Sequence, residues 1–371
     1  MITIKNIKAL DGQITNLTIE TPLDKKIEGE GRLTLLPALI NPHLSLGNPK
    51  SDEWKCGLES LVQGGFSTVL DIPSYDSPSS SKEELVSKKQ QVDQQLIDLK
   101  IPFHYYPYAK TNSKYVEDLG AQKSLILGSL IQFHQEENGL NDQDWDRIFQ
   151  IAAWEDLPVV INSNHENRWG KTTFNQPYFS LLEKAIHYTE RQNARLFVFN
   201  VSTKEELKLI QEARAKSLLI YAETTPQHLF PEAASLCDFL WEALADGTIE
   251  SIGSGCSFAE LSQERLTWRG NTYNFSNPIF FLPLLLTAYH DKKITLENIV
   301  RLTRVNLYDI FRLERGDKDF VLVDLKREEK VLRVGENKPK EMILKGWPEY
   351  TILQGRVFKS DPNTHHFNHF E

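Results

Sequence analysis

The sequence has little cysteine, and its three cysteines lie far apart. Cys56, Cys237 and Cys256 form no Cys-x-x-Cys pair. An odd, sparse set argues against a disulfide framework and fits a reducing compartment. The chain also lacks a charged N-terminal segment followed by an apolar stretch, so no signal peptide is expected. Both absences favour a cytoplasmic protein.

Long hydrophobic runs are missing as well. The longest uncharged apolar run, residues 277–290, contains prolines and is shorter than the roughly 20 residues that a membrane-spanning helix needs. Dense blocks of Lys and Arg are also missing, and the formal net charge is −9, from 42 basic and 51 acidic residues. A nucleic-acid-binding protein usually presents a basic face. We therefore expect neither a membrane nor a nucleic acid as a partner.

The remaining composition is that of an ordinary globular protein. The 371 residues are 40% hydrophobic and 25% charged, which excludes a disordered chain and a coiled coil. This length suggests about two domains, although an α/β barrel of about 250 residues counts as one. Ten histidines in an acidic chain raise the question of a bound metal.

Short apolar, β-branched segments alternate with segments of helical periodicity. Residues 81–84 and 203–206 are capping boxes that each predict the start of a helix, and residues 54–62 carry apolar side chains at helical spacing. Candidate strands lie at residues 35–41, 67–72, 102–108, 127–133, 158–162, 195–200, 218–222 and 249–253. These eight β/α units predict a (β/α)8 TIM-like barrel over residues 36–316. The alternative is a doubly wound open sheet, but no G-x-G-x-x-G follows the first strand.

Both ends of the chain differ from the middle. Strand-like segments occur there at residues 2–7, 17–20, 319–323 and 350–358. We expect residues 1–35 and 317–371 to form one small β-sandwich domain beside the barrel. The histidine-containing tail, residues 365–369, reads as a flexible terminus rather than a metal site.

Five strings, spread in order over most of the chain, carry a family resemblance. They are Leu36–His43 (L-P-A-L-I-N-P-H), Gly64–Val69 (G-G-F-S-T-V) followed by Ile72-Pro73, Asn200–Glu205 (N-V-S-T-K-E), Glu223–Leu229 (E-T-T-P-Q-H-L) and Phe320–Asp324 (F-V-L-V-D). The chain resembles the cyclic amidohydrolases of the amidohydrolase superfamily, most closely the dihydroorotases of the type often found with aspartate transcarbamoylase. The resemblance implies a metal-dependent-hydrolase barrel with a β-sandwich domain.

The same resemblance implies that most metal ligands have been replaced. Such enzymes hold one or two divalent metals by H-x-H after the first strand, a carboxylate or modified lysine after the fourth, histidines after the fifth and sixth, and an aspartate after the eighth. These positions fall on His43 and Ser45, Glu136, Asn164, Asn200 and Gly255. A catalytic zinc needs about three protein ligands, and amide and hydroxyl groups bind it poorly. We expect no metal cofactor, with His43 and Glu136 as weak candidate ligands.

Catalytic and substrate-binding groups are replaced together. Without a metal, water keeps a pKa of about 15.7 and no hydroxide forms at neutral pH. Gly255 has no side chain to take the proton that the family's aspartate shuttles. The arginine that pairs with the substrate carboxylate falls on Gly47, and the asparagine of the family's M-P-N falls on Ser74.

A relocated metal site is one alternative. His165 with Glu166, or His228 with Glu223, would supply new zinc ligands. Adjacent residues of a strand point to opposite faces, which disfavours the first pair. His228 matches the second histidine of the family's P-H-H-L, usually a structural position.

Three residues are candidates for catalysis without a metal. Cys256 would approach His43 if strand eight neighbours strand one, and a Cys–His pair activates a thiolate. The non-catalytic alternatives are that Cys256 is a small buried residue and that His43 is a hydrogen-bonded histidine of the interior. Asp71 either acts as a general base or caps a backbone turn, and we favour the turn.

These observations predict a non-catalytic dihydroorotase-like protein with a structural or regulatory role. The resemblance suggests aspartate transcarbamoylase as a partner, because in some bacteria an inactive dihydroorotase homologue scaffolds that enzyme in pyrimidine biosynthesis; a homodimer is the other option. The alternative function is hydrolysis of cyclic amide C–N bonds, with relocated metal ligands or without a metal.

Overall fold

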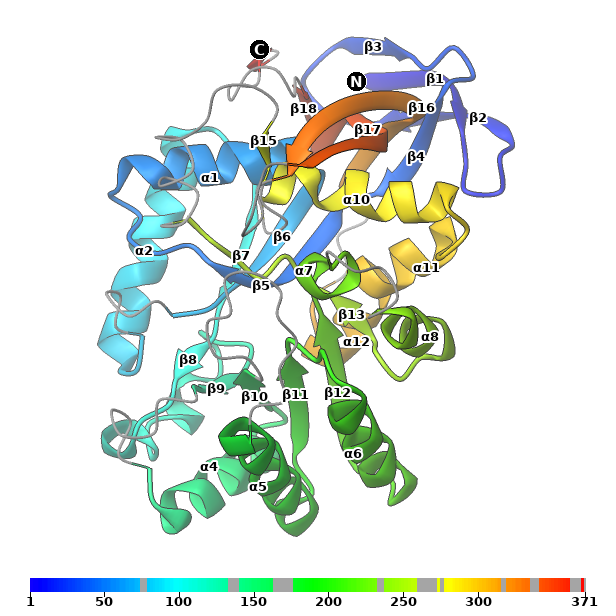
Figure 1. Ribbon diagram of the computed structural model, residues 1–371. Coiled ribbons are helices and arrows are strands. Elements are labelled where there is room, and N and C mark those ends of the chain that lie inside the picture. The colour runs from blue at the N-terminus through cyan, green and yellow to red at the C-terminus, as the bar shows by residue number, and fades with distance from the viewer. Residues whose placement is uncertain are drawn as a thin grey trace.

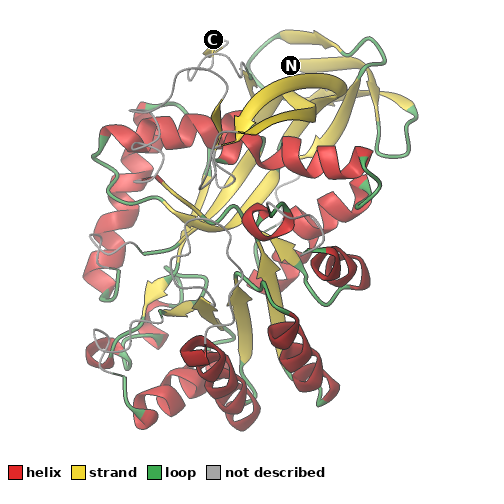
Figure 2. Ribbon diagram, in the orientation of Figure 1, coloured by secondary structure: helices red, strands yellow, loops and turns green. Residues whose placement is uncertain are grey.

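The computed structural model describes most of the chain, in two kinds of sheet (Figures 1 and 2). Parallel strands alternate with helices through the middle of the sequence, and a mixed sheet joins strands from both ends. The described residues are 1–73, 79–132, 140–162, 176–231, 237–258, 272–273, 277–314, 318–333, 340–360 and 368–369.

The parallel strands overlap all of the strand segments predicted for the barrel. They are β5 (Leu39–Ser45), β6 (Phe66–Asp71), β7 (His104–Pro107), β8 (Ala109–Lys110), β9 (Ser129–Ile131), β10 (Pro158–Asn162), β11 (Arg195–Phe199), β12 (Leu219–Thr224), β13 (Ser251–Ile252) and β14 (Cys256–Ser257). Hydrogen bonds arrange them as two arcs, β14-β5-β6-β7 and β13-β12-β11-β10-β9-β8. The α/β class and the parallel pairing are therefore confirmed.

Two short stretches carry the chain from one arc to the other. Tyr108 alone separates β7 from β8, and its backbone N–H donates to the Asp71 carbonyl of β6 at 3.0 Å. Residues 253–255 separate β13 from β14, and the Gly255 N–H donates to the His43 carbonyl of β5 at 3.1 Å. The arcs thus share two continuous stretches of chain, while their closure into one barrel stays a prediction.

Helices pack against the parallel strands, and both predicted capping boxes form. The Glu84 N–H donates to Ser81 Oγ at 3.2 Å, and the Glu206 N–H donates to Thr203 Oγ1 at 3.2 Å. The helices are α1 (Asp52–Gln63), α2 (Lys82–Asp98), α4 (Asp142–Trp154), α5 (Gln176–Gln192), α6 (Lys204–Ala215), α7 (Pro226–Leu229), α8 (Asp238–Asp246), α10 (Pro278–His290), α11 (Leu296–Val300) and α12 (Asn306–Phe311), with a π-helical turn at Arg301–Val305 and 3-10 turns at Ser113–Tyr115 and Gly120–Gln122. Within the described residues, none of the helices combines the length and the apolarity of a membrane span.

The mixed sheet joins the two ends of the sequence. Its strands are β1 (Ile2–Lys8), β2 (Ile14–Ile19), β3 (Lys25–Glu28), β4 (Leu33–Pro37), β15 (Thr272–Tyr273), β16 (Phe320–Arg333), β17 (Lys340–Leu353), β18 (Arg356–Lys359) and β19 (Asn368–His369). β4 pairs antiparallel with β16, and Leu36 lies opposite Val321. The boundaries predicted for a separate β-domain stay a prediction.

Side chains of the parallel strands alternate between two apolar clusters. On β11, Leu196 and Val198 join the cluster that contains the inner faces of the helices, whereas Phe197 and Phe199 join a second cluster with α12. This is the alternation expected of strands buried on both faces. The second cluster fills the other side of the strands, where α12 packs.

Candidate functional site

His43 and Glu223 form a buried pair at the C-terminal ends of the parallel strands. His43 on β5 is 6% exposed and Glu223 on β12 is 0% exposed. The distances from His43 Nδ1 to Glu223 Oε1 and Oε2 are 3.2 and 3.3 Å. The pair therefore connects the two arcs of parallel strands through side chains.

Asn200 extends this contact across two more strands. Its backbone N–H, directly after β11, donates to Glu223 Oε2 at 2.8 Å. Its side-chain amide donates to Asn162 Oδ1, at the end of β10, at 2.8 Å. Both oxygens of Glu223 thus have polar partners, as a buried carboxylate requires.

Gly253 leaves the room that the pair occupies. A Cβ atom at this position would lie 2.2 Å from Glu223 Oε1 and 2.7 Å from His43 Cβ. Real Cβ atoms essentially never approach so closely. Any side chain at residue 253 would therefore displace the pair.

Aromatic rings cover one face of His43. Its imidazole stacks on Phe199, with ring centroids 4.3 Å apart. Tyr108 and Phe197 meet Phe199 edge-on, at 5.9 and 5.2 Å, and Phe311 contacts both of these rings. Apolar packing thus fills the space beside the histidine.

His228 lies close enough to His43 to interact with it electrostatically. It belongs to α7 and is 5% exposed. Burial lowers the pKa of His228 to about 4, and His43 adds to the lowering. His228 is therefore neutral at pH 7.

This buried histidine predicts a loss of stability in acid. Because its pKa falls from 6.5 to about 4 on folding, the unfolded chain binds the proton first as the pH drops. The folded state should lose about 3 kcal/mol between pH 6.5 and pH 4, with no effect from this group above pH 6.5. Urea unfolding of the wild-type chain and of His228→Gln across this range measures the difference.

The control for this prediction is an exposed histidine. His187→Gln makes the same chemical change on the outer face of α5. The stability difference between wild type and His228→Gln should vary with pH, and that for His187→Gln should vary far less. Parallel pH profiles for wild type and His228→Gln would contradict the prediction.

The structure describes four of the positions at which the resemblance predicts a replaced metal ligand or substrate group. Asn200 has φ +58° and Gly255 has φ +63°, both in the left-handed region. A Cβ atom on Gly255 would lie 3.1 Å from Thr225 Cγ2, so an aspartate here would be strained and crowded. Ser45 Oγ is buried and has no hydrogen-bond partner within the described structure. Gly47, at the position of the substrate arginine, also has a positive φ, +67°.

Several predicted site residues lie outside the described residues. They are Ser74, Glu136, Asn164, His165 and Glu166, together with the side chains of the 365–369 tail. Of the other relocated pair, Glu223 contacts His43 directly.

Cys256 lies on β14 beside β5, as the Cys–His hypothesis assumes, but its contacts differ from those of His43. Cys256 pairs in register with Leu44, and both pack in the cluster that includes the helix faces. His43 precedes Leu44 and stacks on Phe199, which belongs to the other cluster. Neighbouring side chains of a strand point to opposite faces, which explains the separation. The 3% exposure of Cys256 fits the interpretation as a small buried residue.

Asp71 is the last residue of β6, and its carboxylate contacts three other segments of the chain. Its Oδ1 accepts the Leu46 N–H at 2.8 Å, and its Oδ2 accepts the Tyr105 hydroxyl at 3.0 Å. Lys88 Nζ of α2 lies 2.6 Å from Oδ2, and both side chains are buried. Burial raises the pKa of Tyr105 well above its usual value, and the negative charge of Asp71 raises it further. The hydroxyl therefore keeps its proton. These contacts give Asp71 a structural role, but they join segments remote in the sequence rather than capping a local backbone turn.

The residues that the structure describes do not fit a catalytic zinc. Among the described residues, no group of three or more His, Cys, Asp or Glu side chains is placed to hold a metal. His43 and Glu223 would supply one imidazole and one carboxylate, fewer than the three or so ligands that such a site uses. The Glu223 oxygens are already bonded to His43 and Asn200.

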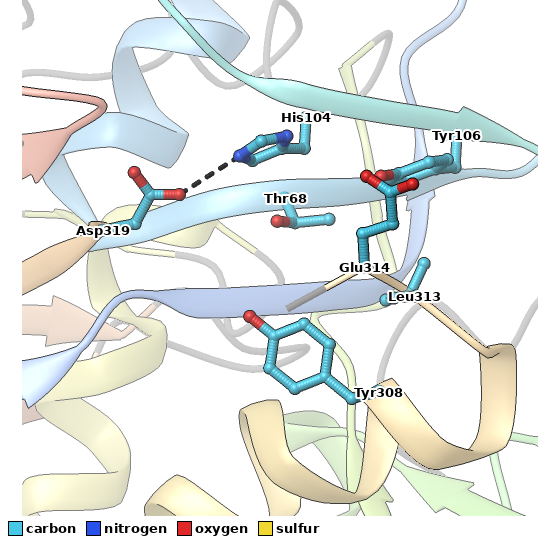
Figure 3. Close-up of a pocket in the computed structure, with 7 residues that line it drawn as sticks. All are labelled: Thr68, His104, Tyr106, Tyr308, Leu313, Glu314 and Asp319. Atoms are coloured by element: carbon cyan, nitrogen blue, oxygen red, sulfur yellow. Dashed lines mark hydrogen bonds and ion pairs between the residues drawn. The ribbon is translucent and has the colours of Figure 1, made fainter. Parts of the chain in front are cut away.

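A small polar hollow lies near the N-terminal ends of the parallel strands, away from the His43–Glu223 pair (Figure 3). His104 Nε2 lies 3.2 Å from Asp319 Oδ2, and Thr68, Tyr308 and Glu314 also line the hollow. Its volume of about 10 Å³ holds roughly one water molecule. This hollow is therefore too small for a substrate.

Comparisons with known proteins agree with the resemblance. No protein-family model matches the chain. It is similar to a dihydroorotase from Methanosphaera stadtmanae, with 23% identity over 396 residues that cover 89% of this chain and 88% of that protein. Among solved structures it is similar to the L-hydantoinase (dihydropyrimidinase) of Arthrobacter aurescens, with TM-score 0.77, 17% identity, and 99% and 98% of the two chains covered. It is also similar to the inactive dihydroorotase-like domain of a Chaetomium thermophilum CAD-like multifunctional protein, with TM-score 0.65, 19% identity, and 88% and 94% covered.

Proposed function

We propose that this dihydroorotase-like chain of the amidohydrolase superfamily is a non-catalytic homologue with a structural or regulatory role. The observation that carries the proposal is the buried His43–Glu223 pair. The resemblance makes His43 a metal ligand, yet here its Nδ1 lies 3.2 Å from Glu223 Oε1, and the other oxygen, Oε2, accepts from the Asn200 N–H. One imidazole and one carboxylate do not hold a zinc that would ionise water.

The proposal treats the two arcs of parallel strands as one eight-stranded barrel. Residues 36–316 form this barrel, and residues 1–35 and 317–371 form the β-sandwich domain. The stretches at Tyr108 and at residues 253–255, which run from one arc into the other, support closure. The fold shared with the hydantoinase supports it as well.

The proposed role is assembly in the cytoplasm, with no bound cofactor. The likeness to a domain described as inactive and dihydroorotase-like, within a CAD-like multifunctional protein, supports a non-catalytic function. We take aspartate transcarbamoylase of the same organism as the first partner to test, and a second copy of this chain as the other.

Zinc content and turnover test the proposal together. The purified full chain, incubated with zinc and then desalted, should retain far less than one zinc per molecule because the donor set is incomplete. Dihydroorotate consumption should not exceed that of buffer with zinc. Metal analysis and a chromatographic assay of dihydroorotate and carbamoyl aspartate provide the measurements.

A matched variant makes the result specific to this site. Any residual zinc should be the same in His43→Ala as in the wild type. One zinc per chain that disappears in His43→Ala, together with turnover, would overturn the proposal in favour of an active hydrolase. Analytical size exclusion with added aspartate transcarbamoylase tests the role: a co-eluting complex supports assembly, and separate elution with a monomeric chain contradicts it.

A further inference from the structure

A groove of about 680 Å³ opens where the end of α10 meets the mixed sheet. Residues of β1, β4 and β16 line one side, and residues 289–292, at and just beyond the end of α10, line the other. Its volume falls in the range of small-molecule sites, about 300–1,000 Å³. The groove shares no lining residue with the site around His43.

Three lysines give this groove an excess of positive charge. Lys8, Lys292 and Lys326 reach it from different elements, and none forms an ion pair with another described residue. Glu30 is the one acidic residue of its described lining. This excess occurs in a chain of net charge −9, so overall composition does not explain it. The lysines outnumber Glu30, and an excess of one sign of charge in a hollow attracts ligands of the opposite sign.

A fourth cation in the groove is already neutralised. Arg32 lies 2.5 Å from Asp324 and 2.7 Å from Glu349. The two carboxylates raise the pKa of Arg32 and hold its guanidinium in place. Two carboxylates against one guanidinium leave one negative charge, which reduces the positive charge that the three lysines offer to a ligand. Arg32 itself shapes the groove.

An apolar surface completes the lining. Tyr289 and Leu325 line the groove, and His290 Nε2 lies 2.7 Å from the Leu325 carbonyl, which ties the end of α10 to β16.

We propose that this groove binds a small organic anion that carries a phosphate or carboxylate group on a planar ring. The lysines bind the anionic group as point charges. The Tyr289 ring packs against the ring of the ligand. The site is independent of the proposed function, because it uses none of the residues around His43.

Three probes separate the parts of this ligand. Phenyl phosphate combines the ring with phosphate, benzoate combines it with carboxylate, and inorganic phosphate lacks the ring. Isothermal titration of the full chain at low salt should show saturable one-to-one binding of phenyl phosphate or benzoate, tighter than that of inorganic phosphate. The tighter of the two ring compounds identifies the anionic group.

Charge-reversal variants locate the binding. Lys292→Glu/Lys326→Glu should weaken binding at least tenfold, about 1.4 kcal/mol. The matched control Lys5→Glu/Lys26→Glu changes exposed lysines of β1 and β3 outside the groove and should weaken it less than twofold. The neutral variant Lys292→Gln/Lys326→Gln serves if charge reversal prevents folding. Equal losses in groove and control variants, or no saturable binding of any probe, would overturn the proposal.

Discussion

Replacing Asp71 by alanine is expected to lower the free energy of unfolding by about 3–5 kcal/mol, because it leaves a buried ammonium without its counter-charge. Lys88 Nζ lies 2.6 Å from the Asp71 carboxylate, and Lys88 is 5% exposed. The Leu46 N–H and the Tyr105 hydroxyl lose their acceptor as well. Urea denaturation followed by circular dichroism measures the change, provided that the m-value is preserved.

A double-mutant cycle separates the ion pair from the other contacts of Asp71. Asp71→Ala/Lys88→Met removes both charges and should recover much of the loss. The control is Asp93→Ala, because Asp93 pairs with Lys89 on the exposed side of the same helix, where such pairs contribute at most about 1 kcal/mol. A loss of less than about 1 kcal/mol for Asp71→Ala would contradict the structural role and return Asp71 to the candidates for general base.

Replacing Glu223 by alanine should cost about 3 kcal/mol of stability, since hydrogen bonds to a buried carboxylate contribute about 1.5–3 kcal/mol each. The wholly buried carboxylate accepts from the Asn200 N–H and faces His43 Nδ1. The truncation also opens a void beside His43. Thermal and urea unfolding of the variant give the magnitude.

Glu223→Gln is the matched control for this substitution. The amide has nearly the same shape and keeps one carbonyl acceptor, while it removes the charge and replaces the second oxygen by an NH2 donor. It leaves no void, so its loss should be smaller than that of Glu223→Ala. Equal losses would mean that charge dominates the pair. No loss in either variant would contradict the inference that the pair connects the two arcs of parallel strands.

Much of the fold follows from local patterns in the sequence. The capping boxes at Ser81 and Thr203 begin helices as predicted, because a capping box acts within one turn of the chain. The strand-like segments at both ends pair in one sheet. The pattern at residues 319–323, however, underestimates β16, which continues to Arg333 through charged residues. Charged side chains suit the exposed side of this strand. They also interrupt the run of apolar residues from which the strand is predicted.

The site was harder to predict because its contacts are remote in the sequence. The sequence suggests His228 and Glu223 as a relocated pair, whereas the structure places Glu223 against His43, 180 residues away. Sheet order, which local patterns do not contain, decides that contact. The burial of Lys88, in contrast, could be predicted from the sequence, because this lysine lies between Leu85 and Val92 on the buried face of α2. A lysine on such a face needs a buried acid, and Asp71 is that acid.

The pairing of β4 with β16 has a consequence for how the protein reaches its native state. Arg32 and Asp324 form an ion pair beside the paired strands β4 and β16, and they are 292 residues apart in the chain. Contacts of such large sequence separation raise the contact order and slow folding. Until β16 arrives, β4 presents an unpaired edge, and an unpaired edge invites association with other chains. A nascent chain that is stalled before residue 320 should therefore depend on chaperones more than the finished protein does.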